Sequence, residues 1–152
     1  MNISRSHLQG RLLAISGALY LFSLLLPALL FEHHEPLVGG NVLAWGWWGV
    51  LLYEFAWFAN PAYFVGVLAY LSKNMPLSKL ASVVAIFLGL TSFHAKEWWF
   101  NEGSGTLILG LGAGYYIWMM SFSVMFAGCF VTSAPNPPPN MDAPPNGGAP
   151  VS

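Results

Sequence analysis

The chain carries very few charged residues, and most of them lie outside its long apolar runs. Its 152 residues include 5 Lys and Arg and 6 Asp and Glu, so 7% are charged, while 56% are hydrophobic. A soluble domain carries about 25% charged residues. A chain this short and this apolar has too little polar surface to face water on every side. We therefore expect a lipid bilayer to be its solvent and its first partner.

Charge and cysteine content exclude several classes of function. The net charge of -1 leaves no basic face that could neutralise nucleic-acid phosphates, so no nucleic-acid partner is expected. Cys129 is the one cysteine, which excludes an internal disulfide, a CxxC redox pair and a cysteine zinc cluster. No nucleophile–base set with a recognisable spacing is present, so no catalytic residue is assigned.

The apolar runs are long enough for membrane-spanning helices, which need about 20 residues each. We predict four such helices, at residues 12–31, 42–71, 77–93 and 107–131. The predicted fold class is therefore all-α, an integral membrane bundle of four transmembrane helices. Residues 1–11 precede this bundle, and the Pro-, Gly- and Asn-rich residues 132–152 predict a disordered tail.

Basic residues set the predicted orientation. Four of the five, Arg5, Arg11, Lys73 and Lys79, flank one side of the predicted bundle, and only Lys96 flanks the other. Basic residues favour the cytoplasmic side of a membrane. This split predicts a multi-pass protein of a bacterial inner (plasma) membrane with its N and C termini in the cytoplasm.

The second apolar run is too long for one straight crossing. Its 30 residues would extend about 45 Å as a helix, whereas the hydrocarbon core is about 30 Å thick. Either the helix tilts and kinks at Pro61, or residues 42–52 lie along the interface, where tryptophan is enriched. Both alternatives stay open from sequence alone.

Glu54 lies in the middle of that second run. A carboxylate in hydrocarbon costs about 2.5 kcal/mol or more, so an intramembrane acid is a candidate proton, ion or polar site. The alternatives are a structural hydrogen bond between helices and a shallow position at the interface. Desolvation would raise the pKa of such a carboxyl.

Histidine and glutamate gather in the two gaps on the other side of the predicted bundle. Imidazole and carboxylate are ligands for zinc and related divalent metals. A metal site is therefore a minor hypothesis, and the alternative is a polar loop with surface histidines. Apart from this possible divalent metal, no cofactor is expected. The candidate ligands are His33, His34, His94 and Glu97.

Small residues form two stripes at four-residue spacing, which is typical of closely packed membrane helices. One stripe comprises Ala81, Ala85 and Gly89, and the other comprises Gly110 and Gly114. The two stripes either pack against each other within the chain or contact another subunit. The ring-rich "GYYIWMM" nearby either lines a quinone, carotenoid or lipid groove, or anchors and packs the helix.

Two short stretches of the sequence resemble a pattern found in other membrane proteins. "FAWFANP" followed by the late "LGAGYYIWMMS" resembles the pattern of small four-helix membrane proteins of bacteria, over roughly residues 12–131. The resemblance implies a bacterial inner membrane. It implies no activity and transfers no catalytic residue.

These observations favour a non-enzymatic integral membrane protein, an accessory or interaction subunit that acts through helix packing. Its partner would be another membrane protein or a second copy of the chain. One alternative is a small oligomeric transporter or proton-coupled carrier that uses Glu54. Another is a metal-binding membrane protein whose histidines lie on the outer face.

Overall fold

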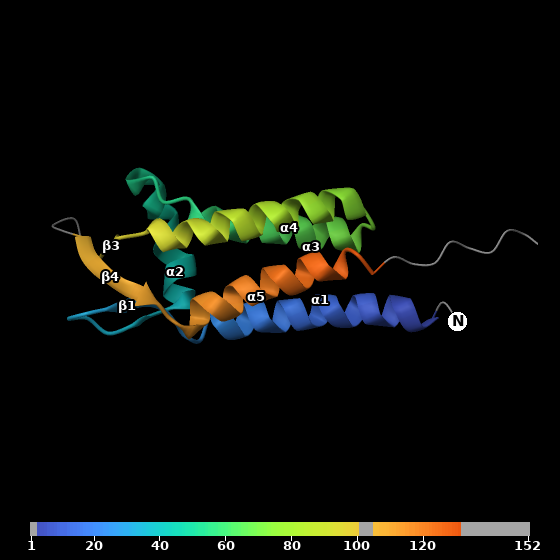
Figure 1. The fold of residues 1–152 in the computed structure, drawn as a ribbon, viewed down its shortest axis with the longest axis horizontal. Helices are drawn as coiled ribbons and strands as arrows, with labels where there is room; N and C mark the ends of the chain where they lie inside the picture. The colour runs from blue at the N-terminus through green and yellow to red at the C-terminus, as the bar shows by residue number, and fades with distance from the viewer. Residues whose placement is uncertain (1–2, 101–104, 132–152) are drawn as a thin grey trace, which may run out of the picture.

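The structure is a computed structural model, and it describes residues 3–100 and 105–131. Among the described residues, the four longest helices run along the molecule, and a small sheet lies at one end (Figure 1). The α-helices are α1 (Ile3–Ser23), α2 (Gly39–Trp45), α3 (Ala59–Leu71), α4 (Met75–Leu90) and α5 (Ala113–Gly128). Short 3-10 helices are η1 (Gly46–Leu52), η2 (Ala56–Phe58) and η3 (Thr91–His94). The strands are β1 (Pro27–Phe31), β2 (Leu37–Val38), β3 (Glu97–Trp99) and β4 (Gly105–Leu111).

The predicted all-α bundle of four transmembrane helices is wrong, because the described chain is a mixed α/β fold. Its antiparallel sheet has the order β2-β1-β4-β3. One segment of the described residues, Met75–His94, is long and apolar enough to cross a membrane, with 20 residues and a mean hydropathy of 1.6. The predicted tail, residues 132–152, lies outside the described residues.

Two of the four predicted helices include a strand. Within residues 12–31 the helix ends at Ser23, and the chain continues as strand β1 from Pro27. Proline lacks the N–H that a helix interior needs and disfavours helical geometry at the residue before it, so the helix stops short of this position. The run at residues 107–131 begins as β4, because short apolar segments suit strands as well as helices.

The second predicted helix is also divided. Residues 42–71 form most of α2, then η1, η2 and α3. The break lies at Tyr53, whose φ of 59° is left-handed and caps the end of η1. Pro61 is the third residue of α3, where no helical partner for its N–H is required, so it belongs to the first turn and does not kink a longer helix.

The long helices form two antiparallel pairs, α1 with α5 and α3 with α4 (Figure 1). The α3–α4 hairpin turns through Lys73, whose φ is 60°, and Asn74 caps α4 by accepting a hydrogen bond from the Leu77 N–H. At this end Tyr70 donates to the carbonyl oxygens of Gln9 and Gly128, which brings three helices together. The helix α4 also packs against α5, joining the two pairs.

Small residues permit the close helix contacts, but not in the predicted arrangement. Ala81 faces Gly66 of α3, Ala85 is fully buried, and Gly89 faces Met119 of α5. Gly110 is in β4 and is not part of a helical GxxxG stripe. Gly114, in α5, lies against the carbonyl oxygens at the end of α1. Ala81, Gly89 and Gly114 therefore have close contacts within the chain, whereas Gly110 and Gly114 do not form one helical stripe.

The core contains many hydroxyl groups, and each has a partner. Ser16 lies 2.8 Å from the Tyr63 hydroxyl and donates to the Ser121 carbonyl oxygen, also at 2.8 Å. Among the described residues, every buried side-chain nitrogen and oxygen atom has a hydrogen-bond partner. Satisfied polar groups of this kind link helices to one another, because a buried polar atom without a partner would be costly.

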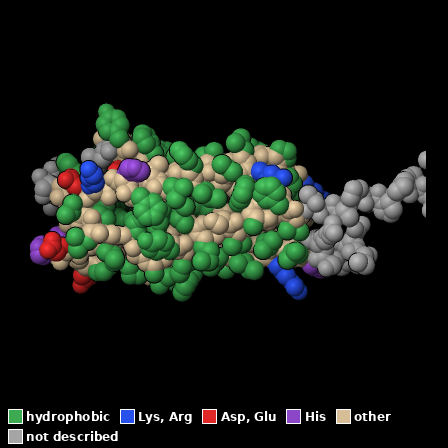
Figure 2. All heavy atoms as spheres, in the orientation of Figure 1, with side chains coloured by type: hydrophobic (Ala, Val, Ile, Leu, Met, Phe, Trp, Pro, Cys, Tyr) green, Lys and Arg blue, Asp and Glu red, His purple; other side chains and the backbone are tan. Residues whose placement is uncertain are grey.

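The outer surface of the helices is apolar. Leu21, Leu68 and Phe87, on three different helices, are 64%, 64% and 68% exposed. Figure 2 shows hydrophobic side chains covering the middle of the molecule, acidic and histidine side chains with one basic group at the sheet end, and further Lys and Arg side chains at the opposite end. The core is mainly apolar with buried serines within it, and so many large apolar side chains on the exterior are unusual for a water-soluble protein.

Candidate functional site: two hollows at the sheet end

Glu54 lies outside the helices, which corrects its predicted position in the middle of a transmembrane helix. It follows the left-handed Tyr53 in the turn between η1 and η2. Its backbone N–H donates to the carbonyl oxygen of Gly49 at 2.9 Å, which fixes this tight turn. The carboxylate is therefore presented at the sheet end of the molecule.

Glu54 shares a hollow of about 290 Å³ with three other titratable side chains. His94 ends η3, Lys96 is in the extended segment that follows, and Glu97 begins β3. The chain continues from α4 through η3 into β3 at this point, and this segment brings the three residues to Glu54. Three of the four, Glu54, His94 and Glu97, were predicted from the sequence as candidate site residues. The sequence did not predict that they lie together, or that Lys96 lies with them.

Burial and charge act on Glu54 in opposite directions. Partial burial raises the pKa of this carboxyl above its usual value, and the nearby His94 imidazole lowers it by a smaller amount. The one ion pair among the described residues is between the exposed Glu32 and His33, at 4.0 Å, so Glu54 forms none there. The net effect is a Glu54 carboxyl beside the His94 imidazole whose pKa lies above its usual value.

The four predicted metal ligands are divided between two places. His33 and His34 are in the connection between β1 and β2, where the His34 ring stacks on Phe100 at 5.0 Å. His94 and Glu97 line the Glu54 hollow. Within residues 3–100 and 105–131, no three His, Cys, Asp or Glu side chains come close enough to hold one ion.

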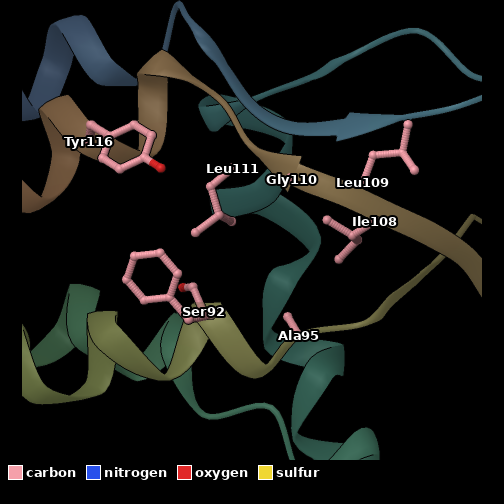
Figure 3. A pocket seen from close by; sticks show the side chains of 8 residues that line it. Ser92, Ala95, Ile108, Leu109, Gly110, Leu111 and Tyr116 are labelled. Carbon is pink, nitrogen blue, oxygen red and sulfur yellow. The ribbon is translucent and has the colours of Figure 1, made fainter.

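A second hollow of about 290 Å³ lies between η3 and β4, and its lining is uncharged. Figure 3 shows Leu111 and Ile108 pointing from β4 toward η3, with Ala95 pointing back toward the strand. Phe93 of η3 and Tyr116 of α5 add two aromatic rings to the lining. We call this hollow the η3–β4 groove. Among the described residues, its lining is Ser92, Phe93, Ala95, Ile108, Leu109, Gly110, Leu111 and Tyr116.

The groove forms because β4 changes partners along its length. Its first part, Gly105 to Leu107, pairs with β3, and the Ile108 N–H donates to the Lys96 carbonyl oxygen at 2.8 Å. Beyond this point the strand pairs with β1, as Leu29 faces Leu111. The chain before β3 leads back to η3, and a space is left beside the last four residues of β4.

The η3–β4 groove was not predicted from the sequence as a binding site. The one signal was the ring-rich "GYYIWMM", of which Tyr116 lines the groove. Ser92 and the residues of β4 carried no signal, because their meeting depends on a sheet that the apolar pattern did not reveal.

Comparison with models of known protein families, with curated proteins and with solved structures finds no match to this chain.

Proposed function

We propose that this chain is a non-enzymatic membrane protein whose helical body lies in lipid and which acts through contacts, as an accessory subunit of a larger membrane assembly. The observation that carries the proposal is the band of exposed apolar side chains between two charged ends. In water such a band would be an aggregation site, whereas in hydrocarbon it needs no cover.

The helix Met75–His94 supports this placement. It has the length and hydropathy of a spanning segment, and only 33% of it is buried within the fold. Its outward side chains include Leu80 and Phe87, which are 62% and 68% exposed. Lipid, rather than water, would therefore contact the outward side chains along most of the length of this helix.

The core supports the same proposal. In lipid the hydrophobic effect does not drive helices together, so small residues and interhelical hydrogen bonds hold them. Gly66 lies close to Ala81, and the Ser78 hydroxyl, which is 2.9 Å from the Gly66 carbonyl oxygen, donates to it. The α3–α4 pair is thus joined by the two kinds of contact that function within a bilayer.

The ends suggest an orientation. Arg11, Lys73 and Lys79 belong to the end opposite the sheet, where α1 begins and the α3–α4 hairpin turns. Basic residues favour the cytoplasmic side, so we place the sheet, with its acidic and histidine side chains, on the outer side of a bacterial inner membrane.

Native mass spectrometry of the untagged protein, extracted mildly from its own membranes, tests this function. We expect the protein in the membrane fraction after an alkaline carbonate wash, bound to another membrane protein at fixed stoichiometry. A chain removed by carbonate would contradict the membrane placement. A carbonate-resistant chain without a protein partner would contradict the accessory role alone.

A further inference from the structure

We propose that the η3–β4 groove binds a neutral, lipid-soluble carbonyl compound about the size of one ring with a short apolar chain. The proposal rests on the proposed function in one respect, that the ligand reaches the groove from the bilayer. It assigns a ligand class to a hollow that is separate from the charged hollow around Glu54.

The floor of the groove is held in place by contacts between α4 and α5. The Tyr115 hydroxyl donates to the Gly89 carbonyl oxygen at 3.1 Å. The Phe93 ring packs edge-on against Tyr115 with centroids 5.5 Å apart. These contacts fix the two helix ends from which the rings of the groove project, so the hollow exists before any ligand enters.

The chemistry of the lining selects a neutral ligand. None of its eight residues is charged, and all but Ser92 are glycine or apolar, or present an aromatic ring. A charged headgroup would lose hydration here without gaining a countercharge, which is strongly unfavourable. The hydroxyls of Ser92 and Tyr116 face the same space as the apolar side chains (Figure 3). Hydroxyls donate hydrogen bonds to carbonyl oxygens, so a carbonyl on an apolar body satisfies both parts of the lining.

The volume limits the size of the ligand. At about 290 Å³ the groove is at the lower end of the range of about 300–1,000 Å³ that is usual for small-molecule sites. A single ring fits this space, whereas a whole two-chain lipid does not. The groove opens beside Tyr116, which is 54% exposed on the same apolar surface as the helices, so a chain attached to the ring can extend into lipid.

Gly110 offers a way to fill the groove without disturbing the fold. It lines the hollow, and a Cβ added there meets no atom within 4 Å. A leucine at this position would occupy the space that we assign to the ligand. Gly17, in α1 and outside the groove, also has no atom within 4 Å of an added Cβ, so Gly17→Leu is a matched control.

Binding of decyl-benzoquinone to the full-length protein in lipid nanodiscs, measured by isothermal titration with empty nanodiscs subtracted, tests the proposal. Decylbenzene, which has the same tail and ring but no carbonyl, is the comparison ligand. We expect saturable one-to-one binding of the quinone and at least tenfold weaker binding of decylbenzene. Gly110→Leu should weaken quinone binding at least tenfold, while Gly17→Leu should leave it unchanged.

Tyr116→Phe removes one hydroxyl from the lining and keeps the ring. Loss of one neutral hydrogen bond should weaken quinone binding about fivefold, with little change for decylbenzene. This variant decides the matter if Gly110→Leu does not fold. Three outcomes would each overturn the proposal. They are equal binding of the two ligands, quinone binding that is the same in Gly110→Leu and Tyr116→Phe as in the wild type, and no saturable quinone binding. Quinone binding by a protein that carbonate removes from membranes would instead contradict the proposed function and leave the groove assignment standing.

Discussion

Tyr20 of α1 and Asn60 of α3 are joined in the core by a hydrogen bond of 2.9 Å, although they are 40 residues apart in sequence. The same Asn60 side-chain oxygen accepts a second hydrogen bond from the indole N–H of Trp118 in α5, also at 2.9 Å. The amide nitrogen donates to the Trp57 carbonyl oxygen. One side chain thus links α1, α3 and α5.

Replacing Asn60 should therefore weaken the whole helical body. In Asn60→Leu the Tyr20 hydroxyl and the Trp118 N–H both lose their acceptor, at a cost of about 2–4 kcal/mol for two buried donors. We expect a large fall in the thermal midpoint of the detergent-solubilised protein, followed by circular dichroism. Asn41 is exposed in α2, and Asn41→Leu should change the midpoint little. Equal effects from the two variants would mean that the Asn60 link does not hold the helices.

Gly110 and Gly114 should respond differently to the same substitution. A Cβ at Gly114 would lie 2.7 Å from the Leu26 carbonyl oxygen and 3.0 Å from that of Ser23, whereas at Gly110 it meets nothing within 4 Å. Backbone oxygens cannot move aside cheaply, so Gly114→Ala should destabilise the fold by about 1–3 kcal/mol. Gly110→Ala should be nearly neutral. Comparable losses for the two variants would instead favour a shared helical stripe.

Pro61 tests where α3 begins. Because it lies in the first turn of α3, its missing N–H removes no helical bond, and Pro61→Ala should change stability by less than about 1 kcal/mol. Val65 is one turn further on, and Val65→Pro should cost about 3 kcal/mol or more. Denaturant unfolding of both variants measures the difference. A large structural change in Pro61→Ala would indicate that the proline shapes a longer, kinked helix.

Glu54 should make stability depend on pH. Burial raises the pKa of Glu54 in the folded protein, so the unfolded chain releases this proton at a lower pH than the folded one. The stability linked to the bound proton is complete below the unfolded pKa and is lost as pH rises through the folded pKa. Glu54→Gln has no proton to lose, so it should exceed the wild type in thermal midpoint at pH 7 and match it near pH 4.

The groups that face Glu54 in its hollow are His94, Lys96 and Glu97. Since the His94 imidazole lowers the pKa of Glu54, His94→Ala should move the pH dependence to higher pH. Glu35→Gln, at an exposed carboxyl between β1 and β2, is the control and should leave the profile unchanged. A wild-type stability that does not vary between pH 4 and 7 would contradict the placement of Glu54 in a partly desolvated hollow.

The sequence pattern predicted the helices better than the ends that join them. The predicted run at residues 77–93 overlaps most of α4 (Met75–Leu90), because it is mainly apolar and follows the asparagine and proline of a tight turn. The sheet could not be predicted from the same pattern. Segments such as "PALLF" and "GTLILGL" are short and apolar, and only their pairing across the fold selects a strand over a helix.

The site was less accessible to prediction than the fold. Glu54 was recognised as unusual, but its placement depends on the left-handed conformation of Tyr53, which no residue preference signals. The η3–β4 groove depends on where β4 exchanges β3 for β1 as its partner, a property of register rather than composition. Hydrophobicity alone therefore predicted the apolar surface but not the hollows at its end.

The depth of Phe87 in a bilayer tests the central claim most directly. Phe87 is 68% exposed in α4, and a nitroxide attached there by way of Phe87→Cys, in a Cys129→Ser background, reports its surroundings. In vesicles of phosphatidylethanolamine and phosphatidylglycerol, we predict that collisions with oxygen are frequent and collisions with a water-soluble nickel chelate are rare. A nitroxide at Glu32, at the sheet end, should show the reverse. Equal access of the nickel chelate to both positions would contradict a lipid-facing helical body.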